Sequence, residues 1–156
     1  GHTWSDTWSC WQQNRQVSVA GRKRQCGICA ACMLRRMSVH AAGLTEEPQT
    51  YVWEDLSASS FVDGAAKEFK LITKALREYA IAGTLHLDHL ASLKHRKSGD
   101  CTLALAATQL TRSRGITEAE TRTRLDRLLS AHEAEWTRFV RSLGAQSFVA
   151  QWARQR

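Results

Sequence analysis

The order of apolar and polar residues predicts a mainly α-helical chain. In its last two thirds, apolar residues recur at steps of three and four, the spacing of one face of an α-helix. The first helix of this part is expected to run from about Val62 to Gly83. Its apolar face consists of Val62, Ala65, Ala66, Phe69, Ile72, Leu76 and Tyr79, opposite Lys67, Lys70, Lys74 and Arg77. Shorter helices are expected at about 86–95 and 101–112, with a basic turn and Gly99 between them.

A capping box predicts the start of the longest helix. In Thr117-Glu118-Ala119-Glu120, the Thr117 hydroxyl and the Glu120 carboxylate can each accept a hydrogen bond from a free backbone N–H. The apolar stripe that follows, as far as Gly144, consists of Leu125, Leu128, Leu129, His132, Trp136, Phe139, Val140 and Leu143. We expect His132 to be a hydrogen-bonded core residue, and a last short helix at about 148–152.

The first third of the chain has a different pattern. Residues 1–24 are polar and aromatic without a helical period, which predicts a loop with a short strand. A helix is expected over 33–42, ending at Gly43, where a left-handed cap fits. The expected organisation is a zinc-binding cysteine region over 1–56 and a helical bundle over 61–156, packed together as one unit.

Four cysteines carry the clearest chemistry in the sequence. Cys10, Cys26, Cys29 and Cys32 have the spacing C-x15-C-x2-C-x2-C. Zn²⁺ prefers four thiolates in a closed structural site, and ligands that close together in a turn can converge on one ion. Gly27 suits such a turn because it lacks a Cβ atom. The sequence therefore predicts a structural zinc site with these four ligands.

Other interpretations of the cysteines are an iron–sulfur cluster, a redox C-x-x-C pair and disulfides. Disulfides require an oxidising compartment, but the sequence shows no signal segment and no apolar run of membrane-spanning length. A reduced, cytoplasmic metal site without membrane contact is favoured, and the cluster and the redox pair remain the alternatives. Cys101, alone in a helical stretch, is expected to be a small buried residue.

The charge of the chain favours acidic partners. The formal net charge is +7, and four thiolates with one Zn²⁺ would leave about +5. Arg22, Lys23 and Arg24 form a basic cluster just before Cys26. With the nearby tryptophans, this cluster could bind nucleic acid by contacting phosphates and stacking bases, and the alternative is a solvated loop.

Further polar residues are candidates for chemical roles. Arg35 and Trp11 are candidates for supporting the thiolates or facing a substrate, whereas Arg36 is expected to be exposed. The pair His86 and His89 has a metal-compatible spacing but no third ligand nearby, so a partly buried or capping pair is favoured. Ordinary surface ion pairs with Glu118 and Glu120 account for Arg122, Arg124 and Arg127. No residue is assigned a catalytic role.

The residues around the cysteines resemble a known family. The matching segments are Ser9-Cys10-Trp11, Cys26-Gly27-Ile28-Cys29-Ala30-Ala31-Cys32, Arg35, Ala42-Gly43 and Pro48-Gln49-Thr50-Tyr51. Together they resemble the C-terminal zinc region of 7-cyano-7-deazaguanine synthases, over roughly residues 3–53. The helical remainder looks like the longer extensions of divergent homologues, including those in anti-phage operons.

The resemblance implies a role beside an active site. Members of the family bind structural zinc with these cysteines and use ATP and ammonia to convert a deazapurine, 7-carboxy-7-deazaguanine, into its nitrile on an α/β domain. That domain carries an S-G-G-x-D-S loop, which this sequence lacks. We therefore expect the chain to be inactive alone, as the C-terminal part of a longer protein or as a subunit beside a separate ATP-binding chain. Its pathway, queuosine-type biosynthesis or defence, stays open.

Overall fold

The structure is a computed structural model that describes residues 4–11 and 18–153. Within them the chain forms five α-helices: α1 Ala30–Ala41, α2 Lys74–Ala91, α3 Gly99–Arg114, α4 Glu118–Ser142 and α5 Phe148–Ala153. Three 3₁₀ turns, η1 Trp4–Asp6, η2 Pro48–Thr50 and η3 Leu93–His95, and a hairpin of β1 Ser18–Val19 and β2 Arg22–Lys23 complete the described elements. The predicted mainly α-helical class with an N-terminal cysteine region is confirmed.

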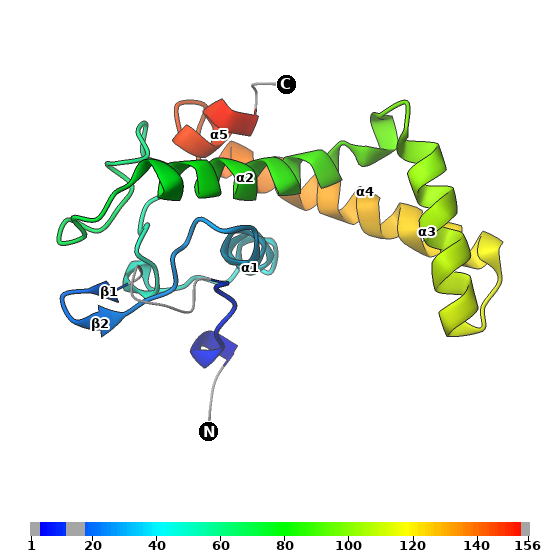
Figure 1. Cartoon of the computed structure of the whole chain (residues 1–156), viewed down its shortest axis with the longest axis horizontal. Helices are drawn as coiled ribbons and strands as arrows, with labels where there is room; N and C mark the ends of the chain where they lie inside the picture. The colour runs from blue at the N-terminus through cyan, green and yellow to red at the C-terminus, as the bar shows by residue number, and fades with distance from the viewer. Residues whose placement is uncertain (1–3, 12–17, 154–156) are drawn as a thin grey trace.

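The two long helices α2 and α4 run along the long axis of the molecule (Figure 1). Helix α1 packs against both of them at one end, α5 packs against them near the same end, and α3 packs on α4 at the far end. The cysteine loop and the hairpin lie beside α1, on the side away from α5 (Figure 1). Among the described residues, no helix is long and apolar enough to cross a membrane.

Helix α2 corrects two of the predicted boundaries. It begins at Lys74 rather than Val62, because the Thr73 side chain caps it by accepting a hydrogen bond from the Leu76 backbone N–H at 3.2 Å. It continues through Gly83 to Ala91, so the two helices expected over 62–83 and 86–95 are one element followed by η3.

The segment before α2 buries its apolar residues without being helical. Trp53 is fully buried, its ring stacks on Phe61 at 4.6 Å, and Phe69 meets it edge-on at 5.5 Å. The Trp53 indole N–H donates to the Phe61 carbonyl at 2.8 Å. Phe69, from the predicted apolar face, is therefore buried against Trp53 without a helix. Val62, from the same predicted face, is exposed.

Several other predictions are confirmed. Helix α1 is followed by Gly43 with φ +67°, and α5 lies where the last short helix is expected. Thr117 caps α4 by accepting from the Glu120 N–H at 3.2 Å, whereas the Glu120 carboxylate pairs with Arg124 at 2.6 Å. Helix α3 begins at Gly99, which was expected in the preceding turn.

Candidate metal centre

The four predicted ligands meet in one buried cluster. Cys10 comes from the N-terminal segment, Cys26 and Cys29 from the loop after β2, and Cys32 from the first turn of α1. Their sulfur atoms all lie within 4.8 Å of one another, and all four residues are buried. They are free thiols rather than disulfides.

The distances fit a single tetrahedral ion. Four Zn–S bonds of about 2.3 Å in a tetrahedron place the sulfur atoms about 3.8 Å apart. The Sγ atoms of Cys26 and Cys32 are 3.8 Å apart. An iron–sulfur cluster inserts several iron atoms between its thiolates and needs them farther apart, so the spacing favours one ion.

Backbone N–H groups point at the sulfur atoms. The N–H of Cys26 donates to Cys10 Sγ at 3.2 Å, that of Cys29 to Cys26 Sγ at 3.4 Å, and that of Cys32 to Cys29 Sγ at 3.3 Å. Cys29 is also the N-cap of α1, where the helix dipole favours negative charge. These donors stabilise thiolates, the form in which cysteine binds metal.

The cluster needs a positive charge to hold four thiolates. Hydrogen bonds between the sulfur atoms are the largest influence on all four groups: they raise the pKa of Cys26 and Cys32 and lower the pKa of Cys10 and Cys29. A divalent ion bound among the four sulfur atoms favours the ionised form of all of them.

The loop that carries Cys26 is fixed by a close backbone approach. Gly27 has φ +81°, and a Cβ atom there would lie 2.9 Å from the Trp53 carbonyl oxygen. The N–H of Trp53 donates to the Cys26 carbonyl at 3.1 Å, and Gln25 pairs with the segment around Tyr51. The turn predicted from Gly27 is thus bound against the strand-like segment after η2.

Gln25 is a site residue that sequence reasoning missed. Its side chain is buried, and its Oε1 accepts from the Ser9 N–H at 3.0 Å and from the Ser9 hydroxyl at 3.3 Å. It thereby ties the residue before Cys10 to the residue before Cys26. Its only signal in the sequence is its place directly before a ligand.

Arg35 supports the centre through the N-terminal segment. Its guanidinium donates to the Thr7 carbonyl at 2.7 Å and to the Ser9 hydroxyl at 3.4 Å, and it pairs with Glu46 at 2.7 Å. Glu46 in turn accepts from the Tyr51 hydroxyl at 2.5 Å. Arg35 therefore holds the Cys10 segment against α1 through hydrogen bonds to oxygen atoms of Thr7 and Ser9.

Arg36 is partly buried, so the prediction that it is exposed is wrong. Its guanidinium donates to the carbonyls of Trp53 and Glu54 at 2.7 and 2.8 Å and lies 4.4 Å from the Tyr51 ring centre. Burial lowers its pKa. Arg36 thus binds the backbone after η2, the segment on which the cysteine loop packs.

The remaining predicted residues near the centre separate into two groups. Arg24 is held by Glu54 at 2.6 Å and by the Tyr51 carbonyl at 3.3 Å. The side chains of Trp11, Arg22 and Lys23 are exposed.

The histidines and the fifth cysteine lie elsewhere. Cys101 is exposed on α3, so the prediction that it is buried is wrong. Helix α3 packs against α4 with one face, and its other faces are open to solvent. His86 and His89 are exposed on α2 rather than partly buried. His132 is buried and its Nε2 lies 3.0 Å from the Leu87 carbonyl, as predicted for a core histidine.

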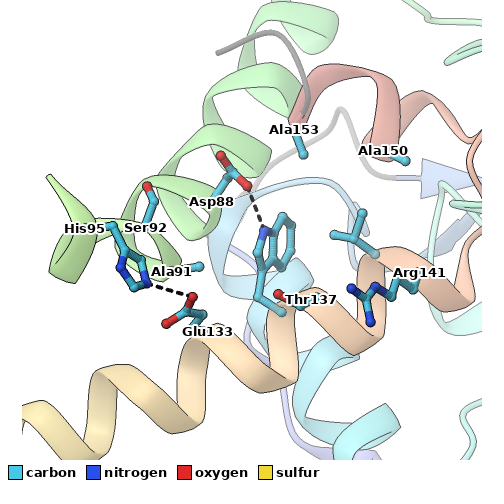
Figure 2. A pocket seen from close by; sticks show the side chains of 11 residues that line it. Asp88, Ala91, Ser92, His95, Glu133, Thr137, Arg141, Ala150 and Ala153 are labelled. Atoms are coloured by element: carbon cyan, nitrogen blue, oxygen red, sulfur yellow. Dashed lines mark hydrogen bonds and ion pairs between the residues drawn. The ribbon is translucent and has the colours of Figure 1, made fainter.

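A cavity of about 470 Å³ lies between α2, α4 and α5, away from the cysteines (Figure 2). On one wall Asp88 accepts from the Trp136 indole N–H at 3.1 Å, and at its edge His95 pairs with Glu133 at 2.9 Å. These bonds join α2 and η3 to α4. The polar groups of the cavity thus hold the long helices together.

The comparisons with known proteins do not identify a family for this arrangement. The chain matches no protein-family model, no curated protein and no solved structure.

Proposed function

We propose that the four cysteines hold one structural Zn²⁺ ion, and that the chain is the zinc-binding portion of a 7-cyano-7-deazaguanine synthase-like protein. The observation that carries the metal assignment is the buried cluster of four sulfur atoms within 4.8 Å of one another. A buried all-thiolate set leaves no open position for a substrate and is typical of structural zinc. The ion would join the N-terminal segment, the cysteine loop and α1.

Two contacts support the family part of the proposal. Ser9 and Arg35 belong to the pattern that resembles the synthases, and their side chains meet at 3.4 Å beside Cys10. Tyr51, from the last matching segment, is linked to Arg35 through Glu46. Three of the matching residues, Ser9, Arg35 and Tyr51, are therefore connected beside the cluster, which supports a shared structural role.

The metal assignment is tested by elemental analysis of the purified chain. We expect one zinc and no iron per chain. The variants Cys26→Ser and Cys29→Ser should bind no zinc and should be unfolded. The matched control is Cys101→Ser, which removes an exposed thiol outside the cluster and should keep both. Iron in place of zinc, or a folded Cys26→Ser protein, would contradict the proposal.

The synthase-like part is tested with the ATP-binding half. In our proposal that half is a further part of the same protein or a separate chain, and only the assembled protein converts 7-carboxy-7-deazaguanine with ATP and ammonia. The assay measures nitrile formation by the assembly, by the 156-residue chain alone and by an assembly carrying Cys101→Ser. An assembly that binds zinc but forms no nitrile would contradict the synthase-like function and would leave the zinc assignment unchanged.

A further inference from the structure

Three tryptophans close to the metal centre are exposed. Trp4, Trp8 and Trp11 have 45%, 46% and 64% of their surface accessible, although tryptophan side chains are usually largely buried. All three lie in the segment 4–11, which also supplies Cys10. We call these three residues with Arg22 and Lys23 the tryptophan face.

Hydrogen bonds fix the segment 4–11, which contains the three tryptophans. The Trp8 indole N–H donates to the Cys10 carbonyl at 3.2 Å, so this ring is tied to a cysteine of the cluster. The Trp4 carbonyl accepts from Arg35 at 3.4 Å, and Ser9 is bound by Gln25. The anchored Trp8 ring loses little conformational freedom when a ligand stacks on it.

Positive charge lies beside the rings. Lys23 Nζ is 5.2 Å from the Trp8 ring centre, and the Arg35 guanidinium is 5.8 Å from the Trp4 ring. Arg22 and Lys23 are exposed on β2, next to the turn of the hairpin. A ring with a neighbouring cation can stack on a base while the cation contacts the adjacent phosphate.

We propose that the tryptophan face binds single-stranded nucleic acid by stacking its bases on the tryptophans and pairing its phosphates with Arg22 and Lys23. A single strand fits better than a duplex, because only unstacked bases expose flat faces to aromatic rings. A protein partner is the competing occupant, because tryptophan and arginine are also enriched in protein interfaces although lysine is depleted there. Arg24 is excluded from the contact surface because Glu54 holds it.

The binding site does not depend on the synthase-like reading, so the zinc-loaded chain is sufficient for the test. Fluorescence anisotropy of labelled single strands and duplexes of about 12 nucleotides measures affinity between about 50 and 200 mM salt. Quenching of tryptophan emission in the same titration reports stacking. We expect the single strand to bind more tightly, with quenching, and binding to weaken as salt rises.

Variants separate stacking from charge. Trp8→Ala and Trp11→Ala should each weaken binding by roughly 5- to 100-fold where the ring stacks on a base. Combined Arg22→Ala and Lys23→Ala should lower the slope of log affinity against log salt by about 1.4. The matched controls are Arg112→Ala with Arg114→Ala and, for the apolar loss, Leu128→Ala, all at exposed positions on α3 and α4. Zinc content and circular dichroism verify that each variant is folded.

Three results would overturn the proposal. The first is no binding, or equal binding of duplex and single strand. The second is loss of binding by the control variants to the same extent as by the tryptophan variants. The third is self-association of the chain, seen by light scattering and abolished by Trp8→Ala with Trp11→Ala, which would assign the face to a contact between copies.

Discussion

A Cβ atom on Gly83 would lie 2.5 Å from the carbonyl oxygen of Ile28, so α2 lies directly on the backbone of the cysteine loop. The same atom would lie 3.0 Å from the Ala30 backbone nitrogen. A side chain at this position cannot avoid the clash by changing rotamer, because both neighbours are backbone atoms. The packing of the helices and the geometry of the metal centre are therefore coupled at Gly83.

Replacing Gly83 with alanine should destabilise the zinc-loaded protein by about 2 kcal/mol, because the loop or the helix must move. At an open helical position the same change would stabilise by about 1 kcal/mol, so the expected sign is opposite to that of helix propensity. Urea unfolding measures the free energy, and competition with a chelator measures zinc affinity, which should fall.

The control for this variant is Ala82→Gly, one residue earlier on the exposed side of α2. It should cost about 1 kcal/mol through propensity alone and leave zinc affinity unchanged. A Gly83→Ala protein that is more stable than the wild type and binds zinc equally well would show that the loop does not constrain α2.

Gly83 also shows where prediction from the sequence fails. Glycine commonly ends helices, so the pattern predicts an end there, whereas the structure uses its missing side chain for contact with a loop more than fifty residues earlier. Similarly, the apolar spacing before Thr73 resembles a helix, but Phe69 from this spacing packs edge-on against Trp53 and Val62 is exposed. Both errors arise because local periodicity carries no information about distant partners.

The four cysteines could be predicted because their spacing alone restricts the chemistry. Cys26, Cys29 and Cys32 are close enough in sequence to converge in one turn and the start of α1, and the structure brings Cys10 to them. Their supports are harder to foresee. Gln25 and Glu46 are ordinary polar residues in the sequence, and only the folded chain gives them their buried bonds to Ser9, Arg35 and Tyr51.

Arg35→Ala should lower zinc affinity by about 10- to 100-fold, as loss of supporting hydrogen bonds does in other metal sites. The change releases Thr7 and Ser9 from α1 and leaves the Glu46 carboxylate without its ion pair. Chelator competition at neutral pH measures the effect. Arg35→Lys should be intermediate because lysine keeps the charge but lacks the planar fork.

The matched control for Arg35 is Arg127→Ala, an exposed arginine on α4. It removes the same charge far from the cysteines and should leave zinc affinity within twofold, as expected for a surface change. Equal losses in the two variants would mean that net charge, rather than anchoring of the Cys10 segment, controls zinc binding.

Tyr51→Phe should destabilise the protein by about 2 kcal/mol near neutral pH, because the lost hydroxyl donates to the Glu46 carboxylate. Burial, and then the bond to Glu46, raise the pKa of Tyr51 above its ordinary value of 10.0. The folded state thus keeps the proton while the unfolded chain loses it. The stability that Tyr51 contributes is full below pH 10 and falls as the pH rises further.

Urea unfolding of the two proteins from pH 7 to pH 11 tests this dependence. The difference in stability between wild type and Tyr51→Phe should be constant up to about pH 10 and then shrink. Taking the difference removes the titration of lysines and cysteines common to both proteins. A difference that grows above pH 10 would mean that the folded state favours the ionised tyrosine.

The last prediction concerns Trp136 and Asp88, which both line the cavity and join α4 to α2. Both are buried, so Trp136→Phe should cost about 2 to 3 kcal/mol, from lost packing and from a carboxylate that loses a donor. A double-mutant cycle with Asp88→Ala should give a coupling of about 1.5 to 3 kcal/mol, typical of a hydrogen bond to a charged group. Zinc content should not change in any of these variants, because the cavity is separate from the cysteine cluster. Additive losses in the cycle would assign the whole effect of Trp136 to packing and none to its bond with Asp88.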